Sequence, residues 1–320
     1  ESIAMSLAGL ALVRNLQATF GADADVTFRE QGYLMLAAAD RAGILAGNVS
    51  LQRRHGADIA LLDPEALARR FPWLSTDGVA CGAFGESGEG WLDPASLLAL
   101  FQRSARDKGA RYLAGEVAAI EVADASAVAV CLADGRRIAC DRLVICAGPQ
   151  SGRVAAMAGI ELPVRPLKRF VFSFDGRDLP ADLGRAPLTI DPAGVWFRPE
   201  GRQFICGVSP TDPADEPAPD DLDLIDHDLF ATHIWPVLAT RVPAFTAIKA
   251  TGAWAGHYDD NAFDHNAVIG PHPAVANVVL CTGFSGHGLQ HAAAAGRAVA
   301  ELLIDGGYRT LDLSRLGFAR

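Results

Sequence analysis

A glycine-rich turn between an apolar strand and a helix constrains the fold of this chain more than any other segment. Residues Ala276 to Cys281 form an apolar run, and Leu289 to Ile304 consist largely of Ala and Leu. Between them lie Gly283, Gly286 and Gly288, in the spacing Gly-x-x-Gly-x-Gly. Glycines let the backbone approach a flat ligand closely, and a helix start offers N–H groups at its positive end. The segment predicts a site for an electron-rich group, although a turn that only packs tightly can share this spacing.

Size and charge limit the classes of protein to consider. The chain has 320 residues, of which 50% are hydrophobic and 21% charged, so it can bury a large core and falls in the range of two-domain proteins. A net charge of -10 argues against nucleic-acid binding, which needs a basic surface. No apolar run approaches the roughly 20 residues that span a bilayer, so we expect no transmembrane segment.

The cysteines and histidines show no ligand framework. The six cysteines contain no C-x-x-C pair, and most lie in apolar, strand-like segments such as the one around Cys146. They are expected to be small buried hydrophobes in a reducing compartment. The eight histidines are scattered, none is expected to form an H-x-x-x-H pair on a helix, and we expect no metal site.

The order of the predicted elements favours a mixed α/β fold. Helices are expected from Glu1 to Leu16, from Ala39 to His55, and after the capping pairs Asp63-Pro64 and Asp93-Pro94. Strands are expected at 26–29 and 32–37, joined as a hairpin by Glu30-Gln31-Gly32, and at 111–117, 118–122, 127–132, 137–140, 141–148, 167–174, 188–190, 195–199 and 204–208. Asp134-Gly135 is a hairpin signal, and a short helix follows from Ser151 to Ala158.

This pattern predicts two discontinuous domains, because segments with α/β character flank a β-rich insertion. One domain is expected to comprise residues 1–25, 88–160 and 252–320, and the other residues 26–87 and 161–251. The insertion carries an antiparallel sheet. Its acidic, Pro-rich stretch from Asp212 to Asp228 is expected to be a solvated loop that runs into a helix start.

The segments around the glycine-rich turn resemble a known superfamily. Trp254-Ala255-Gly256-His257-Tyr258 is followed by Asp264, by Val268-Ile269-Gly270-Pro271 and by Thr282 to Gln290. This order resembles the C-terminal signature of the D-amino-acid oxidase and sarcosine oxidase superfamily of FAD-dependent oxidoreductases. The strand Leu143 to Gly148 likewise resembles that family's flavin-domain strand ending in Ala-Gly.

Further landmarks extend the resemblance over nearly the whole chain, towards a branch that includes an assembly factor of mitochondrial complex I. The landmarks are Gln31-Gly32-Tyr33-Leu34, Phe71-Pro72-Trp73, Glu89-Gly90-Trp91-Leu92-Asp93-Pro94, Lys168-Arg169-Phe170-Val171, Arg241-Val242-Pro243-Ala244-Phe245 and Tyr308-Arg309-Thr310-Leu311-Asp312-Leu313-Ser314. The family begins with a strand, a G-x-G-x-x-G turn and a helix. Nothing here matches that unit, so Glu1 is expected to correspond to a helix beyond it, with the N-terminal βαβ segment missing.

The resemblance implies a Rossmann-like FAD-binding domain with an inserted antiparallel-sheet substrate domain. The residues that it places at the cofactor are Val117, Ala147, Gly148, Gly283, Phe284, Ser285, Gly286, His287, Gly288, Leu289 and Gln290. For substrate contact we expect His257, Tyr258 and Arg198, since Arg can clamp a carboxylate through two hydrogen bonds. Each has an ordinary structural alternative, such as a surface ion pair for Arg198. Positions 254–260 contain no Cys, so FAD is expected to be bound noncovalently.

Two functions follow from this resemblance. The first is oxidation of a small secondary amine or amino acid, such as sarcosine, dimethylglycine or a D-amino acid, by hydride transfer to flavin. The alternative is a flavoprotein that acts mainly as a binding or assembly factor for a respiratory complex, because fold resemblance does not fix function. The high content of Ala, Arg and Gly suggests a bacterial source and therefore a cytoplasmic location.

Overall fold

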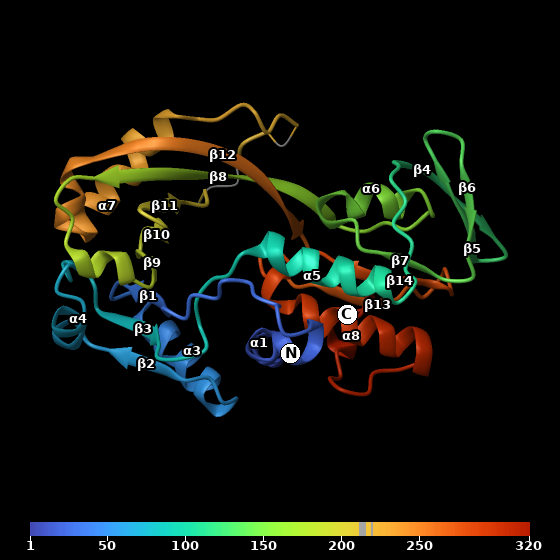
Figure 1. Cartoon of the computed structure of the whole chain (residues 1–320), viewed down its shortest axis with the longest axis horizontal. Helices are drawn as coiled ribbons and strands as arrows, with labels where there is room; N and C mark the ends of the chain where they lie inside the picture. The colour runs from blue at the N-terminus through green and yellow to red at the C-terminus, as the bar shows by residue number, and fades with distance from the viewer. Residues whose placement is uncertain (211–215, 219) are drawn as a thin grey trace. The chain divides into compact units, whose positions relative to one another are not determined.

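The computed structural model describes residues 1–210, 216–218 and 220–320, which divide into two compact units. The first unit contains Glu1–Val26, Asp93–Leu167 and His257–Arg320, and the second contains Thr27–Leu92 and Lys168–Gly256 (Figure 1). Both units combine helices with sheets, so the predicted mixed α/β class is confirmed. No helix of the described residues is long and apolar enough to cross a membrane.

A three-stranded sheet organises the first unit. Its order is β13 (Val268–Pro271), β14 (Val278–Thr282) and β7 (Leu143–Ile145). Strands β14 and β7 are parallel, with Leu280 opposite Ile145, so their carboxyl ends lie side by side. The long helix α8 (Gly288–Asp305) begins shortly after β14 and packs against α1 (Ser2–Arg14).

A separate antiparallel sheet of β4 (Val117–Ala123), β5 (Ser126–Leu132) and β6 (Arg137–Ala139) belongs to the same unit. The hairpin predicted at Asp134-Gly135 is confirmed, because β5 and β6 pair across it and Gly135 has a φ of +87°. The expected strand at 111–117 is wrong, since β4 is one strand that begins only at Val117.

The second unit is built on an eight-stranded sheet in the order β12-β8-β11-β10-β9-β1-β3-β2. These strands are β12 (Ile248–Asn261), β8 (Val164–Gly176), β11 (Gln203–Gly207), β10 (Trp196–Glu200), β9 (Leu188–Ile190), β1 (Tyr33–Ala37), β3 (Cys81–Gly85) and β2 (Ile59–Leu62), and the ends of β8 and β12 run into the first unit. Strand β1 is parallel to β9, whereas the pairs β1–β3, β2–β3, β9–β10, β10–β11 and β8–β11 are antiparallel. Phe172, Phe174, Phe197, Phe204 and Phe245 fill the core beside this sheet.

The hairpin expected around Glu30-Gln31-Gly32 is wrong. Arg29 makes only an isolated bridge to Trp91, and β1 pairs with β3 and β9. Gly32 has a φ of +80°, and its N–H donates to the carbonyl of Glu89 over 2.9 Å. The turn at Glu30-Gln31-Gly32 therefore places the chain against residues 85–91, more than 50 residues later in the sequence. It does not pair the two segments that flank it.

Helix starts agree with the predicted capping pairs. Helix α4 (Pro64–Arg70) is capped by Asp63, whose carboxylate accepts from the N–H of Ala66 over 2.8 Å. Asp93 accepts from the N–H of Ala95 over 3.0 Å at the start of α5 (Pro94–Asp107). The remaining α-helices are α2 (Leu16–Phe20), α3 (Ala42–Arg54), α6 (Ser151–Ala156) and α7 (Trp235–Arg241), the last preceded by a π-helical turn at Phe230–Ile234.

Two basic residues of β8 anchor the acidic stretch predicted to be a solvated loop, part of which lies outside the described residues. The ammonium of Lys168, which is buried, donates to the carbonyls of Asp221 and Leu224. The guanidinium of Arg169 forms a two-point ion pair with Glu216. The described part of the stretch is therefore tied to the sheet.

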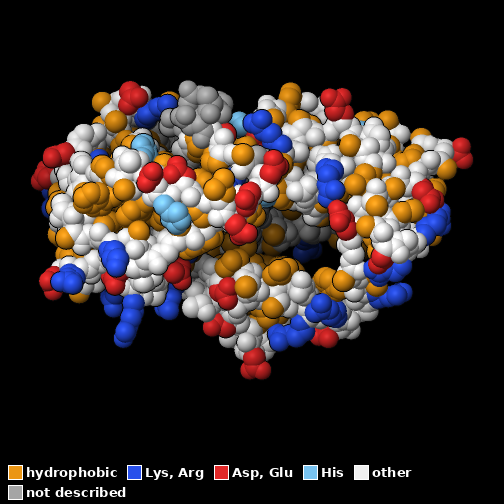
Figure 2. Space-filling model, turned by 90° about the horizontal axis from the view of Figure 1, so that it is seen from above, with side chains coloured by type: hydrophobic (Ala, Val, Ile, Leu, Met, Phe, Trp, Pro, Cys, Tyr) orange, Lys and Arg blue, Asp and Glu red, His pale blue; other side chains and the backbone are white. Residues whose placement is uncertain are grey.

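On the face of the molecule shown in Figure 2, acidic and basic side chains are interspersed, so neither sign of charge dominates it.

Candidate functional site

The loop between β14 and α8 has the backbone that its glycines predict. Gly283 and Gly286 have φ angles of +70° and +91°, and Ser285 also lies in the left-handed region at +49°. A Cβ added at Gly286 would meet no atom within 4 Å. At Gly286 the loop thus presents open backbone, which a flat ligand can approach, whereas a Cβ at Gly283 would meet Val164 and Asn261.

Asp259, on β12, holds this loop in shape. Its Oδ2 accepts from the N–H of Gly283 over 2.7 Å and from that of Phe284 over 3.1 Å, and its carbonyl accepts from Ser285 over 2.9 Å. The hydroxyl of Ser285 accepts in turn from the N–H of Asn261. The sequence analysis missed Asp259, because 24 residues separate it from Gly283.

Helix α8 begins directly after the loop, with His287 at its N-cap position. The His287 side chain makes no capping hydrogen bond. Helix geometry therefore leaves the N–H groups of Gly288, Leu289 and Gln290 without partners inside the helix. These donors lie at the positive end of an 18-residue helix, where an electron-rich group is stabilised.

The end of β7 meets the same loop. Gly148 has a φ of +52°, and a Cβ there would also meet nothing within 4 Å. The hydroxyl of Thr282, the last residue of β14, lies 3.4 Å from the carbonyl of Gly148 and 2.6 Å from the hydroxyl of Ser151. Because β7 and β14 are parallel neighbours, Ala147-Gly148 and the glycine-rich loop lie close together. The sequence analysis expected both segments to contact the same cofactor.

A buried histidine lies in the first turn of α8. His291 is 4% exposed, and its ring stacks on that of His287 with centroids 5.9 Å apart. Burial, reinforced by repulsion from His287, lowers the pKa of His291 to about 4, so its ring is neutral at physiological pH. Its Nε2 has no hydrogen-bond partner among the described residues. A buried nitrogen of this kind is costly unless a ligand or water pairs with it.

His287 and His291 have the spacing H-x-x-x-H at the start of α8, so the expectation that no such pair occurs on a helix is wrong. The part of the chain that the structure describes contains no group of three His, Cys, Asp or Glu side chains suited to a metal ion. The pair lies at the start of α8, directly after the glycine-rich loop.

The cysteines are less uniformly buried than predicted. Cys206 is buried, but Cys146 is exposed, so the expectation of a buried thiol there is wrong. Cys146 follows Ile145 on β7 and lies beside Cys281 on β14. A hydrogen bond between the two thiols lowers the pKa of Cys146 and raises that of Cys281, which burial raises further.

The other predicted residues lie elsewhere in the two units. Val117 opens β4, opposite Leu132, and packs on the same hydrophobic cluster as Ala147. His257 and Tyr258 are successive half-buried residues of β12, so their side chains leave the strand on opposite sides.

Arg198 belongs to the second unit. Its Nη1 donates to the carbonyl of Pro199 over 3.0 Å and forms an ion pair with Glu200. Its guanidinium carbon lies 5.0 Å from the centre of the Trp91 ring. An ion pair was the structural alternative expected for Arg198, and the contact with Glu200 is such a pair. It occupies one nitrogen of the guanidinium, Nη1.

A family model described as FAD dependent oxidoreductase (DAO) matches residues 1–302. The chain belongs to this family. It is 39% identical over 359 residues to FAD-dependent oxidoreductase domain-containing protein 1 of Xenopus laevis, spanning 100% of this chain and 70% of that protein. The Bos taurus protein of the same name is 40% identical, spanning 92% of this chain and 66% of the relative.

The fold of this DAO family member also resembles solved structures. The crystal structure of L-proline dehydrogenase from P. horikoshii matches with a TM-score of 0.84 and 23% identity, covering 98% of this chain and 81% of that one. The two relatives named above come from animals, so they give no support to the bacterial source suggested by composition.

The residues around the glycine-rich loop fit the flavin on which the family depends. The open backbone at Gly148 and Gly286 forms a cradle that a side chain would fill. The orphaned Nε2 of His291 supplies a buried polar atom at the start of α8. Open glycines, helix N–H donors and a neutral imidazole suit a flat, electron-rich ring.

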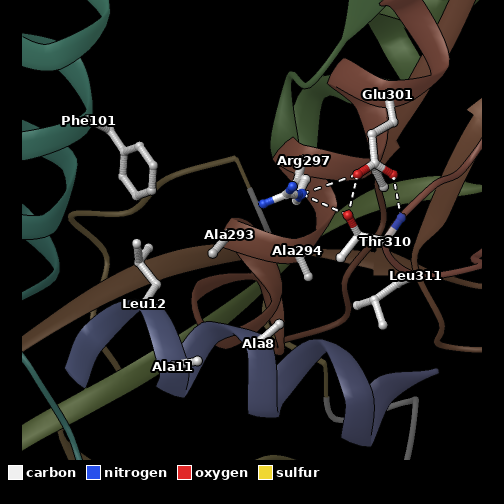
Figure 3. Close-up of a pocket in the computed structure, with 11 residues that line it drawn as sticks. Ala8, Ala11, Leu12, Phe101, Ala293, Ala294, Arg297, Glu301, Thr310 and Leu311 are labelled. Carbon is white, nitrogen blue, oxygen red and sulfur yellow. Dashed lines mark hydrogen bonds and ion pairs between the residues drawn. The ribbon is translucent and has the colours of Figure 1, made fainter. Parts of the chain in front are cut away.

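A separate cavity of about 490 Å³ lies in the first unit between α1, α5 and α8 (Figure 3). Its wall is made largely of small apolar side chains, and Arg297, Glu301 and Thr310 form a polar network at one end. The Glu301 carboxylate accepts from the Thr310 hydroxyl and from the N–H groups of Thr310 and Arg309, at 2.5, 3.0 and 2.7 Å. The network therefore fastens the segment after α8 to the helix.

Glu301 makes the free energy of unfolding depend on pH in the acid range. Hydrogen bonds, first of all from the Thr310 hydroxyl, lower its pKa from 4.5 to about 2. A carboxyl with a depressed folded-state pKa stabilises the fold above its unfolded value, and that contribution is lost as pH falls from about 4.5 to about 2. Denaturant midpoints of the wild type should fall across this window more steeply than those of Glu301→Gln. Parallel pH curves for the two proteins would contradict this.

Proposed function

We propose that this chain belongs to an enzyme that oxidises a small secondary amine or amino acid by hydride transfer to noncovalently bound FAD. The observation that carries the proposal is the glycine-rich loop that Asp259 holds beside Gly148 at the start of α8. FAD supplies the hydride acceptor when it is bound. The absence of Cys from positions 254–260 supports noncovalent attachment.

The residues of the loop orient and stabilise the flavin in this proposal. The backbone from Gly283 to Gln290 contacts the ring, and the helix N–H groups stabilise negative charge that develops on it. The neutral ring of His291 lies in the first turn of α8, and its Nε2 has no hydrogen-bond partner among the described residues. Ala147 and Gly148 form the adjoining wall, and Val117 contributes a backbone contact to the adenine.

We assign the first unit to FAD and the second, with Arg198, to the substrate, and we propose His257 and Tyr258 of the first unit as further substrate contacts. The related fold of a protein named L-proline dehydrogenase supports a substrate with a secondary amine. We also place the protein in the cytoplasm, in keeping with its free cysteines.

Anaerobic flavin reduction tests the proposal. The purified protein, loaded with FAD, is mixed with sarcosine, dimethylglycine, L-proline, glycine or D-alanine, and the flavin absorbance band is followed. At least one compound should bleach the band. If FAD binds but none of these compounds reduces it, the proposed oxidation of amines or amino acids is wrong.

Bound FAD that no compound reduces would favour the alternative, a flavoprotein with little turnover that acts mainly as a binding or assembly factor for a respiratory complex. The resemblance to the branch that includes an assembly factor is the support for this alternative. A protein that binds no FAD at all would contradict both the enzyme and the assembly-factor proposals, because each requires the flavin site.

A further inference from the structure

Two cysteines face each other where the parallel strands β7 and β14 end. Ile145 of β7 lies opposite Leu280 of β14, and the next residue on each chain is a cysteine, Cys146 and Cys281. Residues that face each other on neighbouring strands project to the same side of the sheet. Their Cα atoms are separated by about the 4.7–4.9 Å strand spacing, which falls within the roughly 4.4–6.8 Å that a disulfide bridges.

The two thiols already contact each other. A hydrogen bond joins them, in which Cys281 holds the proton and the sulfur of Cys146 accepts it. Cys146 is exposed and Cys281 is half-buried. Among the six cysteines, all of which the structure describes, Cys146 is the one whose pKa is lowered, and the cause is this hydrogen bond. Burial or a neighbouring hydrogen-bonding group raises the pKa of the other five, which are Cys81, Cys131, Cys140, Cys206 and Cys281. Because the thiolate is the nucleophile of thiol chemistry, Cys146 is the most reactive of the six.

The pair lies at the base of the proposed flavin site. Cys146 is followed directly by Ala147-Gly148, and Cys281 by Thr282 and the glycine-rich loop. The hydroxyl of Thr282 lies 3.4 Å from the carbonyl of Gly148, so the two chains remain adjacent beyond the cysteines. A covalent bond between Cys146 and Cys281 therefore fixes the separation of the two walls of the site.

We propose that Cys146 and Cys281 form a reversible disulfide by exchange with a small-molecule disulfide such as oxidised glutathione, and that this bond slows the release of FAD. The second part rests on the proposed function, because it concerns the same flavin site. A reducing compartment agrees with such a role, since the disulfides of cytosolic proteins are usually transient and catalytic or redox-sensing.

The exchange consists of two displacements. The thiolate of Cys146 attacks one sulfur of the oxidant, so a mixed disulfide forms on Cys146 and a small thiolate leaves, which takes up a proton from solvent. Cys281 then attacks Sγ of Cys146, and its proton passes to the second departing thiolate. In sum, the two cysteines lose two protons and two electrons, and the oxidant is reduced to two thiols.

The hydrogen bond between the thiols assigns the two roles. It is the main cause of the raised pKa of Cys281, which therefore stays protonated while Cys146 attacks. Once Cys146 carries the mixed disulfide it is no longer a thiolate, so this hydrogen bond weakens and Cys281 is more easily deprotonated. Cys146 is thus the attacking thiol, and Cys281 closes the protein disulfide.

Peptide mapping by mass spectrometry tests the disulfide on the whole chain, without FAD or substrate. Reduced wild type incubated with oxidised glutathione should form the link between Cys146 and Cys281, and dithiothreitol should reverse it. Cys281→Ser should stop at a glutathione adduct on Cys146, whereas Cys146→Ser should form no product at Cys281. Circular dichroism establishes that each variant is folded.

Cys140→Ser is the matched control. Cys140 is half-buried, its Sγ lies 3.8 Å from the carbonyl of Ala127, and burial raises its pKa. This variant should form the link between Cys146 and Cys281 as the wild type does.

FAD release tests the second part. The fluorescence of free FAD is followed after dilution of the FAD-loaded protein. Oxidised wild type should release FAD roughly twofold to tenfold more slowly than reduced wild type, because a cross-link lowers the cost of ordering the two walls. Oxidised glutathione should slow release from Cys140→Ser to the same extent and should not change release from Cys146→Ser.

Two results would overturn the proposal. One is a folded wild type in which Cys146 and Cys281 form no link, or link no more readily than the other cysteines, and the other is a disulfide that leaves FAD release unchanged. A protein that forms the disulfide but binds no FAD rejects the flavin site and the second part together. FAD release that depends on the disulfide, in a protein whose FAD no amine reduces, rejects the proposed oxidation alone.

Discussion

Asp259→Ala should lower the affinity of the protein for FAD by roughly tenfold to a hundredfold. The substitution removes the acceptor for the N–H groups of Gly283 and Phe284. Hydrogen bonds to a charged group contribute about 1.5–3 kcal/mol, and about 1.4 kcal/mol corresponds to a tenfold change in affinity. Without Asp259 the loop, which includes left-handed Ser285, samples other conformations and must be ordered again when flavin binds.

Fluorescence titration with FAD measures this effect. Asp259→Asn keeps one acceptor oxygen and should fall between the wild type and Asp259→Ala. Asp305→Asn is the control, because Asp305 ends α8, at the far end from the loop, and interacts with Arg309. Unchanged FAD affinity in folded Asp259→Ala would show that the loop does not depend on this carboxylate.

The contrast between the glycines and Asp259 shows what the sequence can predict about the site. Gly283 and Gly286 lie next to the strand and helix that they join, so their role follows from local backbone geometry. Asp259 acts on the loop across 24 residues, and nothing in its own segment distinguishes it from neighbouring Asp260. The H-x-x-x-H pair of His287 and His291 was visible in the sequence, but the burial of His291 was not.

The fold shows the same division between local and distant causes. The helix starts at Asp63 and Asp93 were predictable, since a capping carboxylate acts on N–H groups two or three residues away. The predicted hairpin around Gly32 failed because pairing with β3 and β9 overrides the local turn signal. The pairing of Cys146 with Cys281 likewise needs the folded sheet, so the sequence predicted only separate buried thiols.

Arg241→Met should destabilise the second unit by about 3–5 kcal/mol, the cost of breaking a buried ion pair by removing one partner. Arg241 is 6% exposed, and its Nε donates to Asp191 over 2.7 Å. Its Nη1 donates to the carbonyls of Ser75 and Asp77. One guanidinium thus joins α7, the segment after α4 and the turn after β9, and its loss leaves Asp191 buried without its cation.

The tryptophans give a direct measurement of this effect. All five, at positions 73, 91, 196, 235 and 254, lie in the second unit, so their fluorescence during denaturant unfolding reports that unit. Arg69→Met is the matched control, since Arg69 pairs with Glu65 on an exposed helix face and should contribute only about 0.3–0.5 kcal/mol. If both variants shifted the tryptophan transition equally, the Arg241 network would be no more important than a surface pair. A large shift for Arg241→Met alone would show that this buried network stabilises the unit to which we assign the substrate.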